Sequence, residues 1–296
     1  MSVVGTLAVS MTAALGGNIG NKIYSKKSSG KMIMAFMASA IASLFSAIVL
    51  LCWGGVTTVS LFTLLLGILF GVVVATQGVM TLKAIEIGPM SYTTVIVSFS
   101  TLISALSGVA FFGESITIWQ IIGMVFMLVS FVFAVEKDEE KRKASWRWLT
   151  FCLIAFFCCG GIGLMQKIHQ SSAYKDELNA FLVIAFATSF LLMSVLSIVT
   201  SKKSKIPMFA RTDLGKLDFV AIVIPILLGV MSAINHKLNL YLSGVIPSAV
   251  FFPIVNGGGL VLATLAAVVL FRERISVRQW IGVGVGVASV IFLCLG

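Results

Sequence analysis

The stretch FFGESITIWQIIGMVFMLVSFVF at residues 111–133 lies over LFRERISVRQWIGVGVGVASVIF at residues 270–292 with a constant offset of 159. Both copies carry a glutamate before a short polar turn and a Gln-x-x-Gly start to the next apolar segment. Further upstream, at an offset of 158, Gln77 aligns with Asn235 and Pro89 with Pro247. Self-similarity at a fixed offset predicts that the chain contains two copies of one structural unit.

The composition excludes a water-soluble fold. Of the 296 residues, 59% are hydrophobic and only 11% are charged, against roughly 25% charged residues in soluble chains. Apolar windows of about 20 residues, the length that crosses a bilayer as a helix, recur ten times. Alternation with period 2, which is typical of a membrane barrel, is absent, so helices are predicted. The windows are 2–22, 32–53, 60–82, 88–112, 116–135, 148–168, 179–200, 219–242, 245–271 and 276–295, numbered here as spans 1 to 10.

Five spans in each copy predict an inverted repeat. Because five is odd, the second copy must enter the membrane in the opposite orientation to the first. The predicted fold is therefore an all-α integral membrane protein with ten transmembrane helices in two inverted-topology five-helix repeats. Residues 1–135 form the first repeat, residues 136–147 a charged cytoplasmic linker, and residues 148–296 the second repeat.

The distribution of positive charge predicts the orientation. Eighteen of the 21 lysines and arginines fall in alternate loops, which the positive-inside rule assigns to the cytoplasm. Both termini are then outside the cytoplasm. Short loops without targeting motifs indicate a multi-pass protein of the plasma (inner) membrane. The net charge of +10 lies in short runs between apolar blocks, so no nucleic-acid partner is expected.

A family resemblance follows from these features. Ten spans arranged as five plus five, with a glutamate after spans 4 and 9 and a Gln-x-x-Gly start to the next helix, resemble the drug/metabolite transporter superfamily, specifically its EamA-type branch. The resemblance covers essentially the whole chain. It implies secondary transport of a small metabolite or drug by alternating access, through a cavity lined mainly by spans 1, 3, 4, 6, 8 and 9. It does not identify the substrate.

No carboxylate is expected inside the membrane, because all eleven acids fall in loops or at span ends. Small members of the superfamily that this chain resembles carry a buried glutamate in the first helix, where this chain has Asn18 and Asn21. Proton-for-cation antiport through a buried carboxylate is therefore disfavoured. The two asparagines either reach a cavity or serve as hydrogen-bonding contacts between helices, and both interpretations stay open.

The most polar part of any span is in span 8, around Asn235, His236, Lys237 and Tyr241. A charge inside a span costs at least about 2.5 kcal/mol unless it is paired, hydrated or extended to the interface. With no acid nearby, His236 and Lys237 suit an anionic or zwitterionic substrate. The alternatives are a lysine that extends to the interface and a histidine that bonds between packed helices.

Spans 3, 4 and 9 supply further candidates. Pro253 and the triplet Gly257–Gly259 surround Asn256 near the middle of span 9, where transporters commonly interrupt helices around substrate. Close packing of small residues is the competing interpretation. The remaining candidates are polar residues of spans 3 and 4, namely Gln77, Tyr92, Ser98 and Ser100.

Four charged residues occupy equivalent positions in the two copies, and we expect them to have structural roles. Glu114 and Glu273 are expected to cap the N-terminus of the helix that follows each of them. Lys22 and Lys167 are expected to be ordinary anchors at the membrane interface.

The sequence therefore predicts a secondary active or facilitative transporter of a small polar or amphipathic metabolite, and not an enzyme. No phosphate-binding loop, metal-ligand cluster or nucleophile–base pair is evident, so no cofactor and no metal are expected. The expected partners are a small-molecule substrate and membrane lipid, with a coupling proton or ion left open. The alternative is a flippase for a lipid-linked substrate or an accessory membrane protein. An ion or Mg²⁺ pathway is disfavoured because the spans lack carboxylates.

Overall fold

The computed structural model describes residues 2–27, 32–56, 58–134, 144–204, 219–272 and 275–296. All regular elements within these ranges are helical. Nine helical segments of the described ranges are long and apolar enough to cross a membrane, and a tenth, Ile118–Ala134, is apolar but has 17 residues. The prediction of an all-α, multi-pass membrane protein is confirmed.

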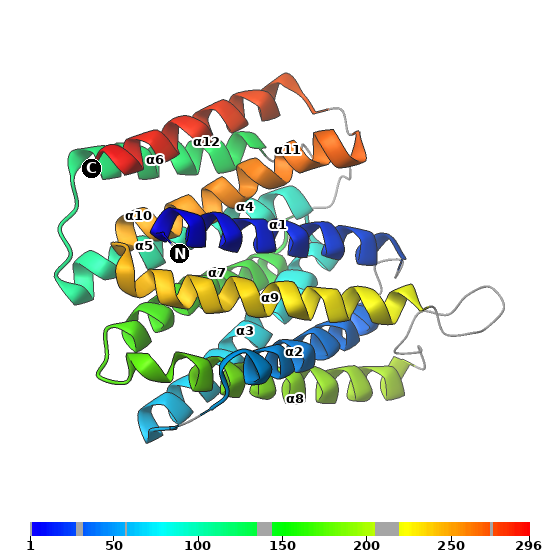
Figure 1. Cartoon of the computed structure of the whole chain (residues 1–296). Coiled ribbons are helices and arrows are strands. Elements are labelled where there is room, and N and C mark those ends of the chain that lie inside the picture. The colour runs from blue at the N-terminus through cyan, green and yellow to red at the C-terminus, as the bar shows by residue number, and fades with distance from the viewer. Residues whose placement is uncertain (1, 28–31, 57, 135–143, 205–218, 273–274) are drawn as a thin grey trace. The chain divides into compact units, whose positions relative to one another are not determined.

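The helices follow the predicted spans closely, with two interruptions (Figure 1). Span 4 consists of two helices on either side of a turn at Phe99 and Ser100, and a π-helical turn, η2, interrupts span 9. Residues 136–143 of the predicted linker lie outside the described ranges. The helices are α1 (Val3–Lys27), α2 (Met32–Gly54), α3 (Leu61–Ile87), α4 (Met90–Ser98), α5 (Thr101–Phe112), α6 (Ile118–Ala134), α7 (Trp146–Gln170), η1 (Lys175–Glu177), α8 (Leu178–Ser204), α9 (Val220–Val245), α10 (Ser248–Pro253), η2 (Ile254–Gly258), α11 (Gly259–Phe271) and α12 (Val277–Leu295).

The repeated glutamine has a capping role at two helix starts. At the start of α6, the Thr117 N–H donates to Gln120 Oε1, and the Gln120 N–H donates to Thr117 Oγ1. Ser276 and Gln279 make the same reciprocal pair at the start of α12. Each pair satisfies two backbone N–H groups that a helix start leaves without partners.

The chain divides into two compact units, and each contains helices from both sequence copies. Unit 1 comprises Met1–Ala75 and His169–Tyr241, and unit 2 comprises Thr76–Ile168 and Leu242–Gly296. In unit 1, α2 packs against α8. Ser46 on α2 also donates a 2.8 Å hydrogen bond to the Gly229 carbonyl on α9. The Phe70 and Phe181 rings, whose centroids are 5.0 Å apart, fill part of the core of unit 1.

In unit 2, α6 and α12 form the most extensive helix pair, and its contacts are reciprocal. Ser130 on α6 donates to the Gly282 carbonyl at 2.7 Å, and Ser289 on α12 donates to the Gly123 carbonyl at 2.6 Å. The two serines are 159 positions apart, as are the two glycines. Small residues at these crossings let the backbones approach closely enough for hydroxyl-to-carbonyl bonds.

Candidate functional site

The break in span 9 forms the first part of the site in unit 2. Pro253 ends α10, and Ile254–Gly258 form the π-helical turn before α11 begins. Proline cannot donate the backbone hydrogen bond of a regular helix, and π-helical turns are frequent at functional sites. Asn256 lies in this turn and donates from Nδ2 to the hydroxyl of Thr101, the first residue of α5, at 2.9 Å. Thr101 is buried, whereas Asn256 is exposed.

The residues beside this turn pack closely against Gly257 and leave only a small pocket. A Cβ on Gly257 would overlap the Met127 sulfur on α6, so a larger residue at position 257 would have to displace the Met127 side chain. A small apolar pocket adjoins the turn, with a cavity volume of about 10 Å³. That is about the space that one water molecule needs and far below the range of about 300–1,000 Å³ typical of ligand sites. Its lining residues are Thr101, Leu102, Met124, Met127, Leu128, Phe131 and Pro253.

Helices α5, α7 and α10 meet closely beside the break. Ser104 on α5 donates to the Gly160 carbonyl on α7 at 3.1 Å. A Cβ on Gly163 would overlap Ser104 Oγ and lie 2.9 Å from the Phe252 ring of α10. Small residues therefore bring three helices of unit 2 into direct contact.

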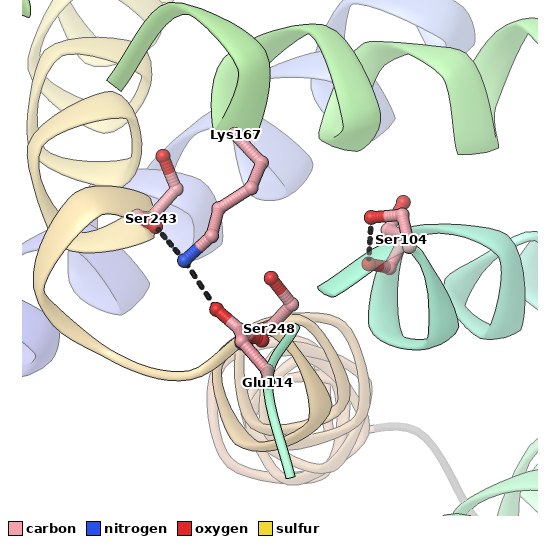
Figure 2. Close-up of polar contacts among 6 residues, drawn as sticks. Ser104, Glu114, Lys167, Ser243 and Ser248 are labelled. Carbon is pink, nitrogen blue, oxygen red and sulfur yellow. Dashed lines mark hydrogen bonds and ion pairs between the residues drawn. The ribbon is translucent and has the colours of Figure 1, made fainter. Parts of the chain in front are cut away.

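An ion pair lies one helical turn away from that contact (Figure 2). Lys167 Nζ lies 2.5 Å from Glu114 Oε1 and donates to the Ser243 carbonyl at 3.1 Å. The second carboxylate oxygen, Oε2, accepts a 2.7 Å hydrogen bond from the backbone N–H of Ser248. The side chains of Lys167 and Glu114 are 9% and 16% exposed, so the pair is largely removed from solvent.

Two sequence-based roles are corrected here. Lys167 is not an interfacial anchor, because its ammonium is buried and paired. Glu114 does cap a helix, but it caps the start of α10; Thr117 and Gln120 cap α6, the helix that follows Glu114. The sequence repeat identifies both positions but not their contacts. The two partners of Glu114, Lys167 and Ser248, lie 53 and 134 residues further along the chain. Glu273, the counterpart of Glu114, lies outside the described residues.

The polar residues of span 8 belong to unit 1, where two of them bond to α1. Asn235 donates from Nδ2 to the backbone carbonyl of Ser10 at 3.0 Å, and Ser10 Oγ donates to Asn239 Oδ1 at 2.6 Å. Asn239 in turn donates to Asn235 Oδ1 at 3.3 Å. Ser10 is fully buried and had not been identified from the sequence, because a single serine in an apolar span carries no pattern. Asn235 is thus used in helix packing in this arrangement.

His236 and Lys237 have aromatic neighbours in unit 1. The Phe70 and Phe186 rings lie nearly perpendicular to the His236 ring, at centroid distances of 6.3 and 5.3 Å, and no described residue pairs with His236 Nδ1. Lys237 Nζ lies 4.3 Å from the centroid of the Trp53 ring, at the C-terminal end of α2. Such a cation–π contact stabilises an ammonium that has no carboxylate partner within the described ranges of the chain.

The eleven candidate residues are divided between the two units. Asn18 and Asn21 on α1 and Tyr241 on α9 are exposed, as is Tyr92 on α4. Gln77 donates to the Thr81 hydroxyl one turn further along α3, Ser98 is half-buried, and Ser100 is buried. Unit 1 contains Asn18, Asn21, Asn235, His236, Lys237 and Tyr241, and unit 2 contains Gln77, Tyr92, Ser98, Ser100 and Asn256.

Comparison with known proteins identifies the fold and no more. No family model matches the chain, and no curated protein matches it. Among solved structures, 29 chains match. One, described only as "Crystal structure of protein", is 15% identical and superposes with a TM-score of 0.73 over 99% of this chain and 98% of its own. A similar helical arrangement therefore exists in a solved protein of similar length.

Proposed function

We propose that the protein is a secondary active or facilitative transporter of a small polar or amphipathic metabolite, built from two five-helix repeats of inverted topology. The observation that carries the proposal is the reciprocal pair of bonds between α6 and α12, from Ser130 to Gly282 and from Ser289 to Gly123. Inverted repeats are the usual architecture of secondary transporters that work by alternating access.

The reciprocity supports a two-fold relation between the copies. In a two-fold contact, residue i of one partner meets residue j of the other, and j of the first meets i of the second. The two serine–glycine bonds meet this condition at the offset of 159. A second set does so too: a Cβ on Gly123 would lie 2.7 Å from Leu293 Cγ, and a Cβ on Gly282 would lie 2.6 Å from the Ala134 nitrogen. Ala134 and Leu293 are again 159 positions apart.

The substrate site is proposed around Asn256. A π-helical turn at mid-span, with an exposed amide that retains one bond to Thr101, is the kind of discontinuous helix that binds substrate in such transporters. Within unit 1, His236 and Lys237 on α9 separately favour an anionic or zwitterionic ligand. Membership of the EamA-type branch of the drug/metabolite transporter superfamily accords with this architecture and with the repeated Glu and Gln-x-x-Gly positions.

Ligand-induced stabilisation tests the proposal. A ligand that binds only the folded protein raises its melting temperature by mass action. In a metabolite library, a class of water-soluble compounds is expected to raise the melting temperature of the purified protein. Asn256→Ala should reduce that shift while the melting temperature without ligand stays unchanged. Stabilisation by lipid-like compounds alone would contradict metabolite transport and favour the lipid-linked flippase.

A further inference from the structure

The ion pair in unit 2 belongs to one of two stacked layers of contacts among α5, α7 and α10. The first layer contains Gly108 of α5, Lys167 of α7 and Ser248 of α10, joined through Glu114. The second layer contains Ser104, Gly163 and Phe252 of the same three helices. On each helix the two layers are four residues apart, which is about one helical turn. The charged layer therefore lies about one helical turn from the layer of Ser104, Gly163 and Phe252.

The charged layer connects more chain segments than a single helix cap would. Glu114 lies in the turn after α5, Lys167 on α7, Ser243 near the end of α9, and Ser248 at the start of α10. Figure 2 shows Lys167 extended between the Ser243 carbonyl and the Glu114 carboxylate, with Ser248 beside Glu114. A Cβ on Gly108 would overlap Glu114 Oε2 and lie 2.7 Å from Ser248 Cβ. Glycine at position 108 thus lets the carboxylate sit between α5 and α10.

The layer beneath contains no ion pair among the described residues. Ser104 and Gly163 themselves bury little apolar surface, and the free energy gained on burial scales roughly with that surface. Phe252 packs against Gly163, and Ile103 on α5 packs against Gly160 on α7 beside the hydrogen bond from Ser104 to Gly160. The charged layer adds to these contacts an ion pair and the hydrogen bonds to Ser243 and Ser248.

The charged layer also leaves one polar group without a partner. Ser248 is 1% exposed, yet its hydroxyl has no hydrogen-bond partner in the described part of the chain. A buried hydroxyl without a partner costs free energy, and a purely static support has no reason to keep one. The Ser248 hydroxyl is thus a hydrogen-bonding group that is not used in this arrangement, next to the Glu114–Lys167 ion pair.

From these observations we propose that Glu114 and Lys167 form a latch that closes unit 2 at the end where α5 and α7 terminate, and that its opening admits substrate between α5, α7 and α10. This inference rests on the transport function proposed above. When the latch opens, the Glu114 carboxylate leaves Lys167 and the Ser248 N–H, and the layer of Ser104 and Gly163 becomes accessible. The Ser248 hydroxyl, which has no hydrogen-bond partner in the closed state, can then bond to Glu114 or Lys167 once the two have separated.

The latch can be tested without a substrate. A single cysteine at Ser104, in a variant whose five native cysteines are replaced, reports access to the second layer. Purified protein in detergent is treated with a charged methanethiosulfonate reagent, and the labelling rate is followed by mass spectrometry. With the latch intact, labelling should be slow. Glu114→Gln and Lys167→Met should each raise the rate at least tenfold.

Two controls separate a latch from general loosening. A cysteine at Ser130, in the contact of α6 with α12, should label slowly in every variant, because the latch touches neither residue of that bond. Ser248→Ala retains the backbone N–H that Glu114 accepts and should label as slowly as the parent. If Glu114→Gln is not recovered folded, Glu114→Asp, which shortens the side chain by one methylene, must raise the rate.

Two results overturn the latch: an unchanged rate at position 104, or equal increases at positions 104 and 130. Either outcome leaves the proposed transport function intact, because that function is tested by ligand-induced stabilisation. Conversely, failure to find a metabolite ligand would not alter the labelling rates.

Discussion

Ser130 and Ser289 make the same hydrogen bond from opposite members of one helix pair, the first to the Gly282 carbonyl and the second to the Gly123 carbonyl. Both hydroxyls are fully buried, and each bond is made within unit 2. Equivalent hydrogen bonds on two paired helices are expected to contribute similar amounts to the free energy of unfolding.

The first prediction concerns these serines. Ser130→Ala and Ser289→Ala should each lower the free energy of unfolding by about 0.5–1.5 kcal/mol, since interhelical hydrogen bonds in membrane proteins are worth roughly that much. The two losses should agree within about 0.5 kcal/mol, as measured by reversible unfolding in detergent. Thr12→Ala, which removes only an exposed bond to the preceding turn of α1, is the control and should be close to neutral. A cost confined to one serine would contradict the two-fold relation.

The second prediction compares two neighbouring glycines of α12. A Cβ on Gly282 would lie 2.6 Å from the backbone nitrogen of Ala134, whereas one on Gly284 would meet nothing within 4 Å. Gly282→Ala should therefore destabilise the protein by about 1–3 kcal/mol through overpacking. Gly284→Ala should be neutral or stabilising, because alanine favours a helix by up to about 1 kcal/mol over glycine. Equal melting temperatures for the two variants would mean that α6 and α12 are not in close contact.

The third prediction addresses Lys237 and its neighbour Trp53. If Lys237 binds an anionic group of the substrate, Lys237→Met should abolish the melting-temperature shift caused by a stabilising anionic or zwitterionic metabolite. The variant keeps the apolar stem, so folding without ligand should hold or improve. Trp53→Leu removes only the cation–π partner and should retain most of the ligand shift. Should Lys237→Met retain the wild-type shift, Lys237 is an interfacial lysine stabilised by Trp53.

The fourth prediction concerns orientation, which the charge distribution alone predicts. Single cysteines at Ser2 and after Gly296 should react with an impermeant reagent added to intact cells, and a cysteine at Ser204 should not. Labelling of Ser204 alone would reverse the orientation. Labelling of all three, or of none, would contradict the number of spans.

The helices themselves were predictable from the sequence because the membrane imposes a simple rule on it. A span needs about 20 apolar residues and must satisfy its own backbone hydrogen bonds, so length and hydropathy suffice to place it. The 159-residue offset also identifies Gln120 and Gly123 from the sequence alone. The structure added the physical reasons, a capping bond for the glutamine and a close helix crossing for the glycine.

The use of each polar residue was decided by the tertiary structure. Asn235 is a candidate substrate ligand in the sequence, and in the structure its amide bonds to Ser10, which lies 225 residues earlier. Lys167 was predicted to lie at the interface, yet it pairs with Glu114. In a span that is apolar on all sides, no hydrophobic period indicates which face meets which neighbour. The partner of a buried polar group is therefore set by helix packing across long sequence separations, and only the folded structure contains that information.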